Sequence, residues 1–300
     1  MSMTEPTWDH YRSFLAVLRE GSLSAAARAL GLTQPTLARH VDQLEAALGG
    51  GALFTRSPGG LLPTAAAQRL APHAEIMAAA AAALVRAASG GQEAQAGIVR
   101  ITASEVIGTE VLPAMLRDLR GTHPGLVFEL VLSNAATDLL RREADIAIRM
   151  TRPRQKALVA RRVGSVMLGL HAHPDYLAAH GSPGCLADLE GHAVVGFDRD
   201  AGAARLLAQS GLPLDQRRFA YRVDDQAAQL AAIRAGCGIG VCQVPLAHRQ
   251  PLLTRLFGDE VDIPLEIWIA MHEDLRGDPR MRLVFDHLHA AMTAYVKARP

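Results

Sequence analysis

The segment 14–49 constrains the fold most, because it joins two short amphipathic helices through a tight glycine turn. The three consecutive alanines at 25–27 let a neighbouring helix approach closely, and Gly31 then ends that helix. Thr33 caps the next helix, and Pro35 stands in its first turn, where a missing backbone N–H costs nothing. Helix, short glycine-containing turn and helix is the order of a helix-turn-helix.

The second of these helices is predicted to have an apolar and a polar face. Four apolar residues spaced four, three and four apart are expected to face the core: Leu37, Val41, Leu44 and Leu48. The polar face carries no carboxylate and consists of Thr36, Arg39, His40 and Gln43. A helix in a major groove needs donors and acceptors for base edges and no negative charge facing phosphate. This face is therefore predicted to read DNA, with Arg39 on guanine and Gln34 or Gln43 on adenine; a solvated surface is the alternative.

Residues 53–64 form two short apolar pieces around a Pro-Gly-Gly turn. This pattern predicts a small β-hairpin, a wing beside the two helices. Arg56 lies on the first strand of the hairpin and is expected to reach toward a phosphate or into a minor groove. An ordinary surface arginine is the alternative.

Residues 8–64 resemble the winged helix-turn-helix of LysR-type transcriptional regulators. The resemblance rests on segments that occur in the family's order and near its spacing: 22–27, 32–40, 44–45, 48–49, 53–56 and Thr64. Together with the helix faces, it predicts the DNA-contacting set Ser24, Thr33, Gln34, Pro35, Thr36, Arg39, His40, Gln43 and Arg56. It implies double-stranded DNA as a partner, and a protein dimer or tetramer on a partly palindromic promoter site.

Three positions depart from the family's usual pattern. Ala38 stands where serine is usual, His40 stands where glutamine is common, and glycines occupy 59–60 at a wing tip that is often basic. These differences predict a weaker or differently tuned DNA contact and not a different function.

Residues 64–91 are rich in alanine and are predicted to form one long linker helix with Thr64 at its start. Pro72 is expected to kink or briefly break this helix without ending it. The bulkier residues Ile76, Met77, Leu84 and Val85 add to the alanine surface. We expect this surface to form a helix-to-helix dimer contact; a solvated spacer is the alternative.

From residue 98 onward, short apolar runs alternate with amphipathic segments. Strands are predicted at 98–103, 126–132, 145–149, 166–171, 193–197, 219–223 and 238–243, and helices at 106–120, 138–143 and 226–234. This alternation predicts parallel βαβ units. The resemblance implies a two-lobed effector domain, similar to periplasmic binding proteins, with lobes at about 98–162 plus 269–300 and at 163–268.

The predicted fold is therefore of the α/β class, with three parts. Residues 1–63 form a winged helix-turn-helix DNA-binding domain, residues 64–91 a linker (dimerisation) helix, and residues 92–300 an effector-binding domain. The resemblance implies that a small-molecule effector, a small polar metabolite, binds between the two lobes and changes how the DNA-binding heads are spaced.

Candidate effector contacts follow from the strand ends, because ligands of open parallel sheets bind beyond the carboxyl ends of strands. Ser104 and Glu105 follow the first strand, Arg149 ends the third, and Asp225 opens the helix at 226–234. Ser104 is expected to give a ligand hydrogen bond, and Arg149 to hold a single carboxylate. For Glu105 and Asp225 the alternative is simple capping of their own helices.

Several classes of function are disfavoured by composition. The net charge of +1 means that DNA binding must come from local placement of side chains. The 3 cysteines form no CxxC pair, which argues against a zinc site or disulfide framework and fits a reducing cytoplasm. Apolar runs such as 78–85 are too short to cross a bilayer, and residues 1–10 show no secretory signal. The predicted location is the bacterial cytoplasm, on the nucleoid when DNA is bound.

No catalytic residue, metal or cofactor is predicted. His171 and His173 could share a strand face but lack a third ligand, and Cys237 and Cys242 are expected to be small apolar residues rather than a redox switch. The alternative function is a two-lobed solute-binding or enzymatic domain with an N-terminal oligomerisation region. That alternative requires a second apolar stripe on the helix at 34–48, and its polar face argues against one.

Overall fold

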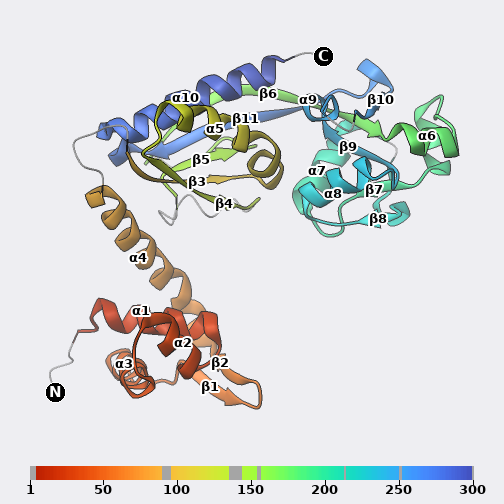
Figure 1. Cartoon of the computed structure of the whole chain (residues 1–300). Coiled ribbons are helices and arrows are strands. Elements are labelled where there is room, and N and C mark those ends of the chain that lie inside the picture. Colours follow the sequence, from red (N-terminus) through yellow and green to blue (C-terminus); the bar gives the residue numbers. More distant parts are fainter. Residues whose placement is uncertain are drawn as a thin grey trace. The chain divides into compact units, whose positions relative to one another are not determined.

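The computed structural model describes residues 5–89, 96–134, 144–153, 157–212, 214–249 and 252–298 (Figure 1). The chain divides near Ala87 into an N-terminal and a C-terminal unit, and each is described by itself. The helix predicted at 138–143 lies outside the described residues.

The N-terminal unit consists of α1 (Trp8–Glu20), α2 (Leu23–Leu30), α3 (Gln34–Ala47), β1 (Phe54–Ser57), β2 (Gly60–Pro63) and α4 (Ala65–Ser89). Ser22 caps α2 by accepting a hydrogen bond from the backbone N–H of Ala25 at 3.2 Å. Thr33 caps α3 by accepting one from the N–H of Thr36 at 3.3 Å. Gly21 and Gly31 end α1 and α2 in the left-handed conformation. The predicted helix-turn-helix and hairpin are both confirmed in this unit.

The first three helices enclose a small core. Ala26 and Ala27 of α2 are buried with Leu37 and Val41 of α3, so the alanine run allows the close approach that its sequence predicts. The predicted burial of Leu48 is wrong. It is 45% exposed, because α3 ends at Ala47 and Leu48 turns away as the C-terminal cap.

The long helix α4 begins inside this unit. Ala67 and Ala74 are buried against Phe14 and Leu15 of α1, so the first turns of α4 belong to the N-terminal core. The helix contains Pro72 and continues past it to Ser89, as predicted. Further along, Ile76, Met77, Leu84 and Val85 are exposed.

The C-terminal unit is built on one sheet. Its strands are β3 (Gly97–Ala103), β4 (Leu126–Leu132), β5 (Ile146–Arg149), β6 (Leu158–Ala172), β7 (Val194–Gly196), β8 (Tyr221–Arg222), β9 (Ile239–Gln243), β10 (Thr254–Leu256) and β11 (Ile263–His272). Their order is β4-β3-β5-β11-β6-β9-β7-β8, with β10 paired to β6. The strands β4-β3-β5 are parallel, as are β9-β7-β8, which gives two lobes.

Two antiparallel strands connect the lobes. β6 and β11 pair along ten residue positions, from Leu158 opposite His272 to Leu168 opposite Ile263. The sheet is therefore mixed, and the parallel arrangement predicted from the sequence holds only within each lobe. The register shifts between Ile267 and Trp268, which is the signature of a β-bulge. The predicted lobe boundaries fall in this strand pair and stay a prediction.

The helices of this unit are α5 (Leu112–Thr122), α6 (Pro174–His180), α7 (Ala201–Ser210), α8 (Gln226–Arg234), α9 (Val244–Ala247) and α10 (Pro279–Lys297). A wider π-turn, Ile107–Val111, precedes α5, and there the N–H of Leu112 bonds to the carbonyl of Ile107. Helix α10 contacts α5, β6 and β11 and buries Phe285 and Leu288 in the main core. Within the described ranges, no helix is both long and apolar enough to cross a membrane.

Candidate functional sites

The start of α3 brings together most of the predicted DNA-contacting residues. Ser24 of α2 donates a hydrogen bond from its hydroxyl to Oε1 of Gln34 at 2.9 Å. The hydroxyls of Thr33 and Thr36 lie 2.8 Å apart. Ser24, Thr33, Gln34 and the neighbouring Pro35 are exposed, and Thr36 is half-buried. These bonds hold a polar, carboxylate-free surface at the N-terminal end of α3.

Arg39 lies one turn further along α3 and is exposed. Among the residues that the structure describes, its guanidinium makes no hydrogen bond or ion pair. It is therefore available to a base edge or phosphate, as a reading residue must be.

His40 and Gln43 have a different environment from Arg39. His40 Nδ1 lies 2.9 Å from the hydroxyl of Ser13, and its ring packs edge-on against His10 at 5.3 Å. His10 Nε2 lies 3.0 Å from Oε1 of Gln43. Thr36, His40 and Gln43 are spaced four and three residues apart, so they lie along one side of α3. His40 and Gln43 contact α1 on that side, whereas Arg39 lies on a different side of the helix. Burial lowers the pKa of His40, so the neutral ring that bonds to Ser13 is favoured. Base contacts by His40 and Gln43 stay a prediction.

The wing is fixed to the turn between α1 and α2. The N–H of Leu61 donates to the carbonyl of Gly21 at 2.7 Å. Gly60 has a φ of 126°, and a Cβ there would lie 2.6 Å from the same carbonyl oxygen. Arg56 pairs in register with Leu61 and is exposed. Gly60 is thus required by close packing against Gly21 as well as by the turn that the Pro-Gly-Gly pattern predicts.

Ser104 is the predicted effector contact with the most suitable environment. It follows β3 at the carboxyl end of the strand and is only 6% exposed. Its hydroxyl has no hydrogen-bond partner within the part of the chain that the structure describes. Burying a hydroxyl without a hydrogen-bond partner costs free energy on folding. A ligand that formed a hydrogen bond to this hydroxyl would offset that cost.

Arg149 and Asp225 form hydrogen bonds with residues of their own lobes. The guanidinium of Arg149 donates to Oγ1 of Thr102 at 2.8 Å and to the carbonyl of Ser133 at 3.0 Å. Asp225 caps α8 by accepting from the N–H of Ala228 at 2.8 Å. The capping alternative thus fits Asp225, and the predicted grip of Arg149 on a ligand carboxylate would compete with bonds inside its own lobe.

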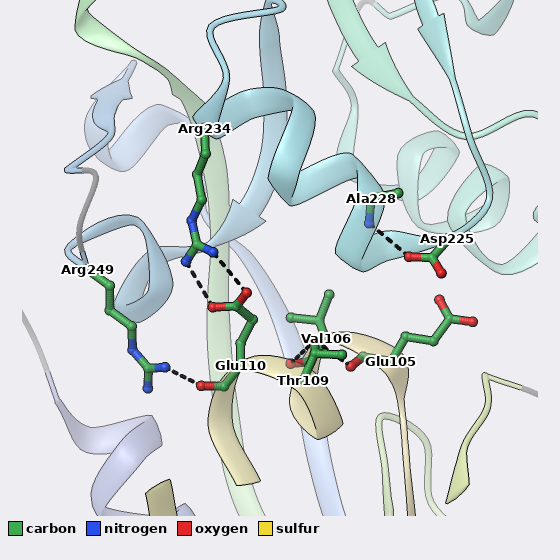
Figure 2. A network of polar contacts seen from close by, with 8 residues as sticks. All are labelled: Glu105, Val106, Thr109, Glu110, Asp225, Ala228, Arg234 and Arg249. Carbon is green, nitrogen blue, oxygen red and sulfur yellow. Dashed lines mark hydrogen bonds and ion pairs between the residues drawn. The ribbon is translucent and has the colours of Figure 1, made fainter. Parts of the chain in front are cut away.

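Glu105 reaches across to the second lobe. Its Oε2 accepts from the backbone N–H of Gln226 at 3.1 Å and from Nδ2 of Asn134 at 2.9 Å. The carboxylate of Glu105 therefore lies at the positive N-terminal end of α8, although the residue itself stands at the start of its own helix. Figure 2 shows its carboxylate beside Asp225 at that end.

A second acidic residue, Glu110, makes further contacts between the lobes. Its two carboxylate oxygens accept from the NH1 and NH2 groups of Arg234 at 2.8 and 2.9 Å, and its carbonyl accepts from Arg249. Both arginines belong to the second lobe, and Glu110 lies in the π-turn of the first (Figure 2). We call Glu105, Glu110, Arg234 and Arg249 the interlobe clamp. Sequence reasoning missed Glu110, Arg234 and Arg249, since no local pattern pairs residues so distant in sequence.

The other polar candidates lie elsewhere. Cys242 is buried, and burial raises the pKa of its thiol to about 12, which leaves little reactive thiolate. His171 lies in β6, whereas His173 caps α6 beyond the end of that strand, so the two do not share a strand face. Within the described residues there is no group of three or more His, Cys, Asp or Glu that could hold a metal ion.

Comparison with known families gives two matches that together cover most of the chain. Residues 8–68 match the family described as "Bacterial regulatory helix-turn-helix protein, lysR family". Residues 92–293 match the "LysR substrate binding domain". The predicted fold class, a winged helix-turn-helix followed by a two-lobed α/β domain, is confirmed.

Comparisons with individual proteins agree with these two family matches. A probable HTH-type transcriptional regulator, LtrA of Klebsiella pneumoniae, is 25% identical over 94% of this chain and 93% of its own length. The mau operon transcriptional activator of Paracoccus denitrificans is 34% identical over 54% of this chain. The chain spans about half the length of that activator (57%) and of a similar Xanthomonas campestris regulator (49%). The structure of full-length CbnR complexed with its target DNA superimposes with a TM-score of 0.68, at 20% identity, over 95% of this chain and 99% of CbnR.

Proposed function

The chain belongs to the LysR family of bacterial transcriptional regulators, and from this we propose how its own residues contact DNA and respond to an effector. The family consists of DNA-binding regulators with an effector-binding domain, so this reading is favoured over the solute-binding or enzymatic alternative. We infer that the protein acts in the cytoplasm and performs no catalysis.

We propose that the start of α3 enters the major groove of a promoter. The observation that supports this best is the exposed Arg39, whose guanidinium lacks a protein acceptor among the described residues beside a surface without carboxylates. Arg39 would bind guanine, and Gln34 would bind adenine once it exchanges its bond with Ser24 for one to the base. Arg56 would contact the backbone from the wing.

We propose that the DNA-bound form is a dimer or tetramer assembled through α4. Leu84 and Val85 are 70% and 65% exposed, although both are large apolar residues on a helix whose first turns are buried. An apolar face of this kind is stabilised by burial against a second helix, and alanines on the same helix permit close approach.

We propose that the effector is a small polar metabolite that binds between the lobes and accepts or donates a hydrogen bond at Ser104. The interlobe clamp includes the chain neighbour of Ser104, since Glu105 follows Ser104 directly. A ligand that draws Glu105 away from the N-terminus of α8 would weaken one of the clamp contacts, and thereby shift the balance between lobe arrangements.

Fluorescence anisotropy with DNA from upstream of the gene for this protein tests the DNA contact. We expect tight binding that weakens with salt and is lost in Arg39→Ala. Arg205→Ala on α7 is the matched control, because it also removes an exposed positive charge, but from the other unit. Equal loss in both variants would mean that Arg39 contributes only net charge, and unchanged binding in Arg39→Ala would contradict its role.

A further inference from the structure

The first lobe contains a hollow of about 430 Å³ where α10 meets the ends of β6 and β11. None of the residues predicted to bind an effector lines it. We propose that this hollow binds a small organic anion with an apolar body, such as an aryl or alkyl carboxylate. This second site does not depend on the proposed effector contact at Ser104.

The floor of the hollow is apolar. Met271 and Phe285 line it and are only 4% and 1% exposed, so their inner surfaces belong to the core of the lobe. Val159 lines it as well and stands directly opposite Met271 in the β6–β11 register. The half-buried Val159 and the small exposed parts of Met271 and Phe285 together form a preformed apolar surface for a ligand.

The rim of the hollow is positive. Arg161, Arg276 and Arg282 line it together with a single carboxylate, Asp286. One Arg161 N–H donates to Asp286 at 3.0 Å, and the same guanidinium lies over the ring of Phe285 at 5.4 Å. Arg161 is thus neutralised and held in place.

Arg276 and Arg282 have no such partner. Both are exposed, and neither guanidinium makes a hydrogen bond or ion pair with any residue that the structure describes. Three guanidiniums and one carboxylate leave two positive charges around one concave surface. An anion in the hollow would reduce the mutual repulsion of these charges, and the guanidinium fork matches a carboxylate in shape.

Size and chemistry together define the ligand class. A volume of about 430 Å³ lies within the range of small-molecule sites, roughly 300–1,000 Å³. The apolar floor favours a ring or short chain over a fully hydrated anion such as phosphate. The walls include β6 and β11, the two strands that connect the lobes, so an occupant would contact the connection directly.

The test uses the full-length protein and phenylpropanoate as probe, with phenylpropanol and phenylpropylamine as matched neutral and cationic analogues. Methyl-labelled methionine allows the Met271 signal, assigned through Met271→Leu, to report on the hollow by NMR. We expect phenylpropanoate to shift this signal in a saturable manner and its two analogues not to do so. In Arg276→Ala/Arg282→Ala the affinity should fall by more than about tenfold, since each charged hydrogen bond contributes about that factor.

Two control variants test whether the binding of phenylpropanoate is specific to the hollow. Arg120→Ala/Arg205→Ala removes the same charge from exposed positions elsewhere and should bind phenylpropanoate like the unchanged protein. Ser104→Ala alters only the proposed effector contact and should leave the Met271 response intact. A saturable shift with the alcohol, an unchanged affinity in the Arg276/Arg282 variant, or no shift at all would each overturn the proposal. A shift with duplex DNA but not with phenylpropanoate would also overturn it, and would assign the two arginines to phosphate contacts.

Discussion

The carboxylate of Glu110 and the guanidinium of Arg234 form two parallel hydrogen bonds, at 2.8 and 2.9 Å, across the two lobes. Their side chains are only 24% and 20% exposed, so solvent screens the pair weakly. Glu110→Gln should lower the free energy of unfolding by about 1–3 kcal/mol, because it leaves a half-buried arginine without its counter-charge.

Urea denaturation of Glu110→Gln, Arg234→Gln and the double variant measures the coupling between the two residues. We expect the double variant to lose less than the sum of the two single losses. Arg117→Gln is the control, since Arg117 pairs with its neighbour Asp118 at the surface and its loss should change little. Additive losses would show that the two clamp residues act independently.

His171 should make the fold sensitive to acid. It is completely buried, and burial lowers its pKa from 6.5 to about 4. The unfolded chain therefore binds a proton at higher pH than the folded chain does. The stability from the neutral ring is present above about pH 6.5 and is lost as the pH falls toward 4, by up to about 3 kcal/mol in total.

Urea unfolding at a series of pH values checks this prediction, with His171→Leu as comparison. The variant should lose less stability between pH 6.5 and 4 than the unchanged protein. His289→Leu is a control, because His289 of α10 is only partly buried. Parallel pH curves for the unchanged protein and His171→Leu would contradict the assignment.

Gly60→Ala should damage the wing. The added methyl group would collide with the carbonyl oxygen of Gly21, and the φ of 126° is unfavourable for any L-residue with a side chain. We expect a stability loss of about 1–3 kcal/mol and weaker DNA binding. Gly59→Ala is the matched control, since a Cβ there meets nothing closer than 4.0 Å. Similar DNA affinities for the two variants, measured by anisotropy, would rule out this role for Gly60.

Ser104→Ala should stabilise the ligand-free protein while removing its response. The substitution deletes a buried hydroxyl that lacks a partner among the described residues, which should raise stability by up to about 1 kcal/mol. The same change removes the proposed hydrogen bond to the effector. Thermal denaturation with and without an effector identified by screening would measure both effects. A lower Tm without ligand, or an undiminished ligand-induced shift, would contradict one half of the prediction.

Local features of the sequence predicted their structures well. Helix α8 has the predicted bounds, Gln226–Arg234, because Asp225 caps its start and its apolar residues repeat at helical spacing. The turn at Gly31 and the caps of α2 and α3 were equally predictable, since each depends on a few adjacent residues.

Features that depend on distant residues were not predictable in the same way. β11 was missed, and β6 was predicted only at 166–171, because both strands extend beyond any single lobe and alternate less clearly. The role of Glu105 at the start of α8 depends on a contact between residues 121 positions apart. Helical spacing predicted His40 and Gln43 on the same face of α3 as Arg39. In the structure α1 packs against α3, so His40 and Gln43 bond to residues of α1 while Arg39 stays exposed.

The paired strands β6 and β11 also set how the lobes can move. They carry the described chain between the lobes as neighbouring, hydrogen-bonded strands, so a change in lobe orientation has to deform a continuous ladder. Such a ribbon resists separation and stretching but twists readily, most of all at an irregular step such as the one between Ile267 and Trp268. The expected response to an effector is therefore a rotation of one lobe relative to the other about the axis of this ribbon.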